Sequence, residues 1–285
     1  MLQFDHVSYT YQPASPVKMT AVRDIDLTIP NGAFVGVIGH TGSGKSTLAQ
    51  HMNALLAPSS GRVLLDQTDI NEKGYDKKQA RCRVGLVFQY AETQLFEETV
   101  FKDIAFGPKN LGLDEKEIAS RVREAMARTG LEFALFAEKS PFELSGGQMR
   151  RVAIAGVLAM RPEILVLDEP AAGLDPMGRN ELLSMIGKLH EEGTTVVMIS
   201  HSMDDVARVA TDILVLDHGK VAMYGKPEEV FSRAEELSAL GLDVPQACAL
   251  SMKLRAAGLD FPICYKTEDA LEALKNLLKG GNAKC

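Results

Sequence analysis

The residues with the most distinctive chemistry form one glycine-rich stretch, G-H-T-G-S-G-K-S, at positions 39–46. It matches the spacing G-x-x-x-x-G-K-[ST], in which successive glycines let backbone N–H groups turn inward onto an anion. The stretch lies between an apolar run at 33–38, typical of a buried strand, and a helical pattern at 47–56, whose N-terminus adds partial positive charge. We therefore predict that a nucleoside triphosphate is bound by Gly39, His40, Thr41, Gly42, Ser43, Gly44, Lys45, Ser46 and Thr47.

Two side chains of this loop and two carboxylates further along the chain predict a magnesium site with a hydrolytic group. Lys45 would reach the β- and γ-phosphates, and the hydroxyl of Ser46 would bind Mg²⁺. Asp168 follows the apolar run 164–167, and a carboxylate at the end of a buried strand suits Mg²⁺, directly or through water. Glu169 is placed to orient or deprotonate a water that attacks the γ-phosphate. The alternative, an exposed acidic turn, is disfavoured by the apolar strand and the glycine-rich loop.

Polar side chains also follow two other apolar runs. Gln89 comes after 84–88, and His201 comes after 194–200. Each could be an ordinary strand-terminal residue. Because ligand groups gather at the carboxyl ends of strands in open α/β sheets, we interpret His201 as reaching the γ-phosphate and Gln89 as reaching into the same site.

A second predicted phosphate-binding helix start is the sequence L-S-G-G-Q at 144–148. Ser145 is a plausible N-cap, and Gly146 and Gly147 leave the first-turn N–H groups open to an anion, next to Gln148. S-G-G alone is a common turn, but a glycine-rich phosphate loop earlier in the chain favours the functional interpretation.

Two further residues have open interpretations. Asp175 precedes Pro176 at the start of a predicted helix, so part of its signal is helix capping. Tyr11 either stacks on an adenine or packs in the core as an aromatic at the end of a strand.

The elements that must position these residues have the pattern of an α/β protein. Residues 100–160 are helical in pattern without a convincing strand, which predicts a helical insertion between sheet elements. After 225 the pattern becomes helical again, which predicts a small appendage at 226–285 whose amphipathic helices form a packing or dimer surface. Strands are expected at 2–9, 21–29, 33–38, 62–65, 84–88, 164–167, 194–200, 213–217 and 221–224, and helices at 47–56, 115–128, 149–160, after 175, and at 228–232, 234–240, 246–257 and 267–279.

The bulk properties bound the classes of function. The chain has 285 residues, enough for one large domain with a small appendage. A net charge of −7 argues against a general nucleic-acid surface. The four cysteines have no C-x-x-C spacing, so zinc ligation through cysteine and a disulfide framework are not expected, and a reducing cytosol fits. No secretory leader or apolar run of about 20 residues is visible, so any membrane contact is expected through a partner.

In order along the chain, the motifs at 39–46, Gln89, 144–148, 164–169, Asp175 and His201 resemble those of ATP-binding-cassette (ABC) ATPases. The resemblance covers residues 1 to about 225. The stretches 88–100 and 103–108 are similar to the ATPases of energy-coupling factor (ECF) transporters, and among these to the second of two paralogous subunits.

The resemblance implies a fold and a set of residue roles. The fold would be a P-loop NTPase of the ABC type at 1–225, with a RecA-like core, an antiparallel β subdomain and a helical subdomain at about 90–160. Glu169, His201 and Gln89 would act in catalysis, and Ser46, Gln89 and Asp168 around Mg²⁺. ATP would be contacted by residues 39–47 and by Tyr11, Ser145, Gly146, Gly147, Gln148 and Asp175, the signature residues acting on ATP held by a second subunit.

The resemblance also implies partners and a location. These are a second ABC ATPase subunit, with a paralogue favoured over a homodimer, a transmembrane coupling subunit and a substrate-binding membrane subunit, and no nucleic acid. The assembly would take up vitamins or similar micronutrients, with this chain on the cytoplasmic face of the cell membrane. The alternatives are a cobalt, nickel or other importer ATPase, and a non-transport ABC ATPase. The latter usually has a coiled-coil insertion or tandem cassettes, and neither is visible here. Membership of the P-loop kinases or small GTPases would not account for the L-S-G-G-Q sequence at 144–148.

Overall fold

The parallel sheet of this computed structural model holds the predicted site. The structure describes residues 1–12 and 18–281. Within them, six strands are ordered β10-β9-β3-β8-β7-β6, and all neighbours are parallel except β9 and β10. Continuous β-branched and aliphatic runs make β3, β7 and β8 buried along their whole length, as expected when helices cover both faces. The strands are β3 (Phe34–Ile38), β6 (Val84–Val87), β7 (Ile164–Asp168), β8 (Thr195–Ile199), β9 (Asp212–Asp217) and β10 (Lys220–Gly225).

The register of this sheet brings three strand ends together. Ile199 of β8 pairs with Val37 of β3 on one side and with Asp168 of β7 on the other. The segments that follow these strands, which include the glycine-rich loop, Glu169 and His201, therefore leave one edge of the sheet. From the loop the chain enters α1 (Lys45–Met52).

An antiparallel sheet packs beside the parallel one. Its order is β2-β1-β4-β5, from β1 (Leu2–Tyr11), β2 (Met19–Ile29), β4 (Ser60–Leu65) and β5 (Thr68–Asp69). Alternating side chains of β1 and β2 share one buried core with α1 and with residues of β3, β7 and β8. Next along the chain, α2 (Lys77–Arg83) leads into β6.

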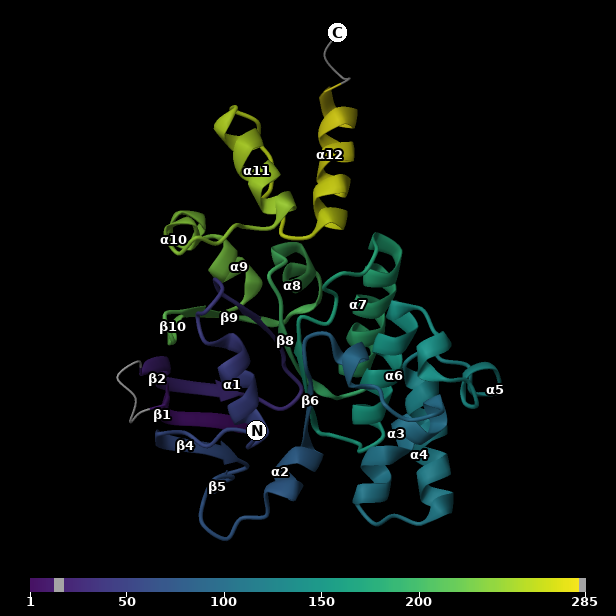
Figure 1. Cartoon of the computed structure of the whole chain (residues 1–285). Coiled ribbons are helices and arrows are strands. Elements are labelled where there is room, and N and C mark those ends of the chain that lie inside the picture. The colour runs from purple at the N-terminus through teal and green to yellow at the C-terminus, as the bar shows by residue number, and fades with distance from the viewer. Residues whose placement is uncertain (13–17, 282–285) are drawn as a thin grey trace.

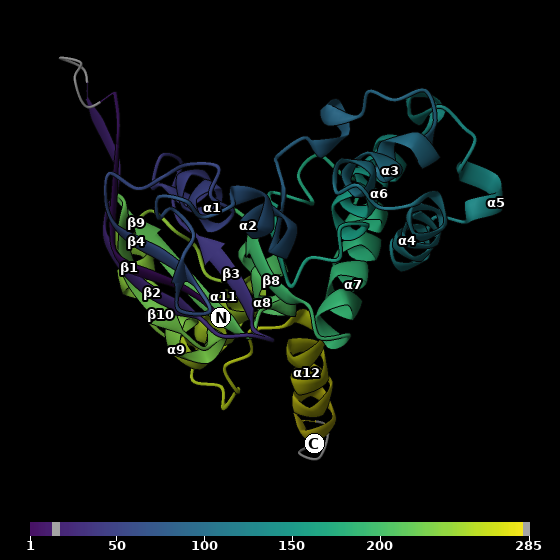
Figure 2. The same ribbon diagram turned by 90° about the horizontal axis from the view of Figure 1, so that it is seen from below.

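The regular elements between β6 and β7 are all helices. Figures 1 and 2 both place α3, α4, α5 and α6 together on the side of the molecule away from the antiparallel sheet. The amphipathic patterns of α3 and α4 explain this grouping, because their apolar faces share one core with α6. The elements are η1 (Ala91–Gln94), α3 (Val100–Asn110), α4 (Glu115–Arg128), α5 (Phe133–Phe136), η2 (Pro141–Glu143) and α6 (Gly146–Leu158).

The remaining helices cover the parallel sheet and form the C-terminal end. They are α7 (Pro176–Glu191), α8 (Met203–Val209), α9 (Pro227–Phe231), α10 (Ala234–Ala239), α11 (Gln246–Ala256) and α12 (Thr267–Gly281). Phe231, Leu237 and Cys248 join the main core, whereas Phe261, Cys264 and Ala270 belong to a small separate core. α12 projects away from both sheets (Figures 1 and 2).

The predicted strands and helices are present, but several boundaries were wrong. The helix expected at 47–56 is Lys45–Met52, because the turn at Gly44 (φ 102°) starts it inside the loop and the left-handed Ala54 (φ 55°) prevents its continuation. The helix expected at 149–160 is Gly146–Leu158, because Ser145 caps it three residues earlier.

Within the described residues, the structure has neither a disulfide bond nor a helix suited to span a membrane. Cys82, Cys248 and Cys264 carry free thiols, while Cys285 lies outside the described part of the chain. Across 1–12 and 18–281, no helix has the length and apolar character that crossing a membrane requires.

Candidate nucleotide-binding site

Glycines at 39, 42 and 44 give the predicted phosphate loop its path. All three have positive φ, at 154°, 82° and 102°. A Cβ on Gly39 would lie 2.3 Å from the carbonyl oxygen of Leu216, and one on Gly44 would lie 2.4 Å from that of Ala21. No side chain fits at those two positions without moving backbone, so the sequence can form this loop only with glycine there.

Lys45 holds its ammonium inside the loop. Its Nζ donates hydrogen bonds to the carbonyl oxygens of Gly39, at 2.7 Å, and His40, at 3.0 Å. Burial lowers the pKa of this ammonium, although the carboxylates of Glu169 and Asp168 oppose the shift. A buried cation held by neutral carbonyl groups would be stabilised further by the negative charge of a phosphate.

Asp168 and Ser46 form an oxygen-rich pair beside Lys45. Burial raises the pKa of the Asp168 carboxyl, while a hydrogen bond from the Ser46 hydroxyl and the charge of Lys45 pull it down. A hydroxyl and a carboxylate are the hard oxygen ligands that Mg²⁺ prefers, so these residues fit the ion. Gln89, the third predicted ligand, is exposed and lies two residues beyond the end of β6.

Glu169 has the features of a group that acts on water. Its backbone is left-handed (φ 51°), and its side chain is only 12% exposed. Oε1 is buried without a hydrogen-bond partner and lies 3.4 Å from Nε2 of His201. Burial and the neighbouring Asp168 raise the pKa of this carboxyl to about 7. A group that is half protonated near neutral pH is well suited to accept a proton.

His201 lies at the rim of the same group. Its side chain is 53% exposed, and partial burial together with the charge of Lys45 lowers the pKa of the imidazole. It is therefore mainly neutral at pH 7 and can accept or donate a hydrogen bond. The structure thus brings Lys45, Ser46, Asp168, Glu169 and His201 into one cluster.

Tyr11 lies beside the first helix after the loop. Its hydroxyl is 3.2 Å from Oγ1 of Thr47, and its partly buried ring packs edge-on against Tyr9 with centroids 4.8 Å apart. This contact joins β1 to the nucleotide-binding loop. It is compatible with either interpretation of Tyr11.

The L-S-G-G-Q segment begins α6 with a complete capping box. The N–H of Gln148 donates to Oγ of Ser145 at 3.4 Å, and the Gln148 side chain accepts from the Ser145 N–H at 3.0 Å. The predicted N-cap role of Ser145 is confirmed. Asp175 is likewise the N-cap of α7, accepting from the Gly178 N–H at 2.7 Å.

These two helix starts line one hollow of about 660 Å³. Ser145, Gly146, Gly147, Gln148 and Asp175 all face it, and none of residues 39–47 does. The two predicted phosphate-binding segments of this chain therefore do not meet in this hollow.

Arg150 is a positioning residue that the sequence did not reveal. It is 4% exposed and pairs with both carboxylate oxygens of Glu92 in η1. Its Nη1 also donates to the carbonyl oxygens of Pro170, at 2.9 Å, and Ala172, at 2.6 Å. Burial alone would raise the pKa of Glu92, but Arg150 outweighs it and holds that pKa below its ordinary value.

Through Arg150, the segment after Gln89, the helix of L-S-G-G-Q and the segment after Glu169 share one buried guanidinium. The signal in the sequence was one of two adjacent arginines in α6, which did not by itself point to partners 58 and 20 residues away.

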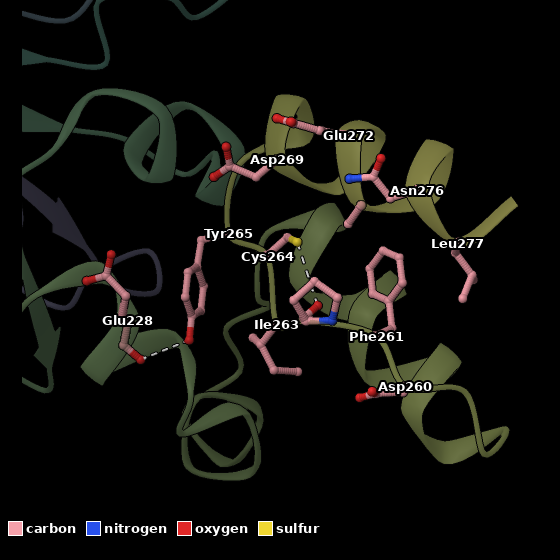
Figure 3. A pocket seen from close by; sticks show the side chains of 12 residues that line it. Glu228, Asp260, Phe261, Ile263, Cys264, Tyr265, Asp269, Glu272, Asn276 and Leu277 are labelled. Atoms are coloured by element: carbon pink, nitrogen blue, oxygen red, sulfur yellow. Dashed lines mark hydrogen bonds between the residues drawn. The ribbon is translucent and has the colours of Figure 1, made fainter. Parts of the chain in front are cut away.

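The chain has another hollow of about 670 Å³, at its C-terminal end (Figure 3). Tyr265 reaches from it to the Glu228 carbonyl oxygen, at 3.3 Å. Carboxylates of Glu228, Asp260, Asp269 and Glu272 line it without a cationic side chain. An acidic lining repels triphosphates, so the nucleotide site remains at the glycine-rich loop.

Comparison with known proteins agrees with this geometry. Residues 22–172 match the family model described as ABC transporter. The chain is 54% identical to the energy-coupling factor transporter ATP-binding protein EcfA2 of Symbiobacterium thermophilum, over 97% of this chain and 96% of that protein. It is 51% identical to the EcfA2 protein of Caldanaerobacter subterraneus, over 98% of each chain.

Two solved structures share the fold. CbiO1 from Clostridium perfringens, described as part of the ABC transporter complex cbiONQ, has a TM-score of 0.74 and 36% identity, over 90% of this chain and 96% of that one. The ATP-binding cassette MJ0796, in a dimeric post-hydrolysis state with ADP and Pi, has a TM-score of 0.71 and 30% identity, over 79% of this chain and 98% of that one. With these similarities and the site described above, the chain belongs to the ABC transporter family of ATP-hydrolysing proteins, among the energy-coupling factor transporter ATP-binding proteins.

Proposed function

We propose that this chain is the second ATPase subunit of an ECF-type importer and powers uptake of vitamins or similar micronutrients. It would pair with another ABC ATPase subunit and sit on the cytoplasmic face of the cell membrane, bound to a transmembrane coupling subunit and a substrate-binding membrane subunit. The observation that carries this proposal is the separation of the two phosphate-binding segments. The hollow lined by the helix start at 145–148 includes no residue of 39–46, so a second chain that supplies the missing segment would complete each half of the site.

In the proposed mechanism, Lys45 and the loop amides bind the β- and γ-phosphates. Ser46 and Asp168 would hold Mg²⁺, which neutralises charge on the phosphate oxygens when bound. Glu169 polarises the attacking water through its unpaired buried oxygen, and His201 contacts the γ-phosphate. The signature residues of the second chain would close over the triphosphate and exclude water, so that positioning and electrostatic stabilisation supply most of the rate.

Contact with the membrane partner is proposed at the surface that follows Gln89. Tyr90, Phe96 and Phe106 are 53%, 59% and 45% exposed, and the rings of Phe96 and Phe106 meet edge-on with centroids 5.0 Å apart. Exposed apolar rings of this kind mark interaction sites. Arg150 then gives a mechanical route from this surface, through Glu92, to the segment after Glu169.

The division of the chain is part of the proposal. Residues 1–225 would form the nucleotide-binding domain, with a helical subdomain at about 90–160, and 226–285 a helical dimerisation appendage. The small core around Phe261, Cys264 and Ala270 supports a separate packing unit at the end of the chain. The alternative of a cobalt or nickel importer ATPase is not favoured, because the relatives at 54% and 51% identity are energy-coupling factor transporter proteins.

The two-chain site can be tested by ATPase assays on mixed subunits. The chain alone, its paralogue alone and their mixture are compared, first native and then with Gly147→Asp in this chain. A Cβ at Gly147 meets only Leu174, at 3.8 Å, so the variant is sterically compatible with the fold while its charge repels an approaching phosphate. We expect the ATPase activity of the native mixture to exceed the sum of the activities of the two separate subunits. Gly147→Asp in this chain should abolish that gain.

The matched control is Gly187→Asp, also inside a helix and with no atom within 4 Å of the added Cβ. It should keep the native gain. Full activity of the isolated native chain at a concentration where it is monomeric by ultracentrifugation would refute the two-chain site, whereas full activity as a homodimer would refute only the need for a paralogue. Co-purification of the mixture with a membrane coupling subunit tests the transport role separately.

A further inference from the structure

Three side chains outside the nucleotide cluster converge at the outer side of the phosphate loop. They are His40 of the loop, Asp217 at the end of β9, and His218 in the turn between β9 and β10. One ligand atom from each lies within 4.8 Å of the others. The two imidazole rings have centroids 4.8 Å apart. Nothing in the proposed mechanism uses this cluster.

The hydrogen bond made by Nδ1 of His40 determines which kind of partner the other ring nitrogen, Nε2, needs. Nδ1 lies 2.8 Å from the carbonyl oxygen of Thr41, which can only accept, so Nδ1 carries a proton. In a neutral ring, Nε2 then presents a lone pair. That lone pair faces Oδ1 of Asp217 at 3.1 Å, so two acceptors meet unless a cation lies between them. A histidine that donates one N–H to a backbone carbonyl and directs the other nitrogen at a cation is the usual arrangement of a metal-bound imidazole.

His218 supplies a third ligand in the same place. Its Nε2 is 3.8 Å from Oδ1 of Asp217, on the side chain that already faces His40. Metal–ligand bonds of about 2.1 Å in a tetrahedral arrangement place neighbouring ligand atoms roughly 3.4 Å apart. The distances of 3.1 and 3.8 Å bracket that spacing. The side chain of His218 is 80% exposed, which leaves room for water as a fourth ligand.

We propose that His40, Asp217 and His218 bind a divalent transition-metal ion of the zinc type. Two imidazoles and one carboxylate suit Zn²⁺, whereas Mg²⁺ prefers oxygen ligands alone. The site is separate from the magnesium site at Ser46 and Asp168.

The ion would link the phosphate loop to the β9–β10 turn. The backbone already joins them, because the Gly219 N–H donates to the Ser43 carbonyl oxygen at 3.0 Å. The His40 carbonyl also accepts from Nζ of Lys45. A metal at His40 would therefore act on the loop that holds the ammonium of Lys45.

The test is direct metal binding to the tag-free, chelator-treated full-length chain without nucleotide. Zn²⁺ is titrated by calorimetry in the presence of excess Mg²⁺, and Co²⁺ is followed by its visible absorption. The native chain should bind one ion at this site with nitrogen and oxygen ligands. His218→Asn and Asp217→Asn should each weaken that binding by at least about tenfold.

The control is built into the fold. His6 is also exposed, also has a left-handed backbone (φ 52°, against 44° for His218) and also faces a carboxylate, with Nδ1 2.9 Å from Oδ1 of Asp24. It has no second histidine beside it in the described chain. Asparagine tolerates the left-handed region, so both histidines can be changed to it without new strain. His6→Asn should bind Zn²⁺ as the native chain does.

Two outcomes would overturn the proposal. One is Zn²⁺ binding that is unchanged in His218→Asn and Asp217→Asn, which would place the metal elsewhere, such as at the thiols. The other is the absence of metal binding in the native chain, and nitrogen-15 spectra of His40 would then show whether a proton joins it to Asp217 instead. Circular dichroism melting confirms that each variant is folded.

Discussion

Glu169 holds a carboxylate where its surroundings oppose ionisation. Burial and Asp168 raise its pKa to about 7, while its Oε1 has no hydrogen-bond partner. As the proposed base it must be deprotonated, so protonation below pH 7 removes the active form. Burial and the neighbouring Asp168, which oppose ionisation of Glu169, therefore also set the pH range in which the site is active.

At this scale we predict the pH dependence of hydrolysis. The value of kcat/KM, which reports the free enzyme, should rise from acidic pH to a plateau above an apparent pKa near 7. Glu169→Gln should lower the rate by about 10²–10⁴-fold while ATP binding persists. Steady-state assays of both proteins from pH 5.5 to about 9, with nucleotide binding measured separately, check this.

Glu169→Gln is also the control for the pH profile of ATP hydrolysis. The phosphates of ATP titrate in a nearby range, and glutamine leaves that contribution in place, so the ratio of the native to the variant rate isolates Glu169. A variant with native activity, or one whose profile keeps the full rise, would remove Glu169 from the role of base.

At the scale of elements, Arg150 joins three segments that are separated in the sequence. The guanidinium of Arg150 connects α6 to η1 and to the chain after β7. The Arg150 side chain is 4% exposed, and its Nε and Nη2 both donate to the Glu92 carboxylate. A buried charge with all of its partners in place rigidifies a junction, and removal of one partner leaves the others unpaired.

We predict that Arg150→Met lowers the free energy of unfolding by about 3–5 kcal/mol, because it leaves the Glu92 carboxylate without its buried partner. Arg151→Met is the comparison. Arg151 is adjacent on α6 but pairs with the half-exposed Glu181, so its loss should cost under about 1 kcal/mol. Denaturant unfolding of the three proteins measures both values. Equal effects of the two substitutions would show that burial of Arg150 adds nothing.

At the scale of the whole molecule, α12 has an apolar face that no other described part of the chain covers. Leu271 and Leu278 are 52% and 69% exposed, and their spacing of seven residues puts them on one face of the helix. Leu274 and Leu277 pack instead against the small core around Phe261. The outer face is the part of the proposed appendage available to a second subunit.

We predict that Leu271→Ser combined with Leu278→Ser weakens subunit pairing and leaves nucleotide binding to the single chain unchanged. Each leucine, if fully buried at the interface, contributes about 1.5–3 kcal/mol, so the dissociation constant should rise by at least about tenfold per residue. Analytical ultracentrifugation with the paralogue measures it. Leu259→Ser, 42% exposed and outside α12, is the control, and an effect equal to that of the double variant would exclude α12 as the pairing face.

The sequence by itself determined the features that depend on neighbouring residues. The glycine-rich loop, the acids after β7, the caps at Ser145 and Asp175, and the identity of most strands and helices follow from local spacing, because loop geometry, capping and alternation act over a few residues. Helix ends were less predictable, since left-handed residues such as Ala54 are set by packing.

Only the tertiary structure decided contacts between distant segments. Glu92 meets Arg150 across 58 residues because η1 packs on α6. His40 meets Asp217 across 177 residues because the sheet order places β9 directly beside β3. Local periodicity predicts that a strand forms, but the choice of its neighbours depends on which faces are buried together. The position of Glu169 beside His201, with one oxygen unpaired, arises in the same way from β7 and β8 lying side by side.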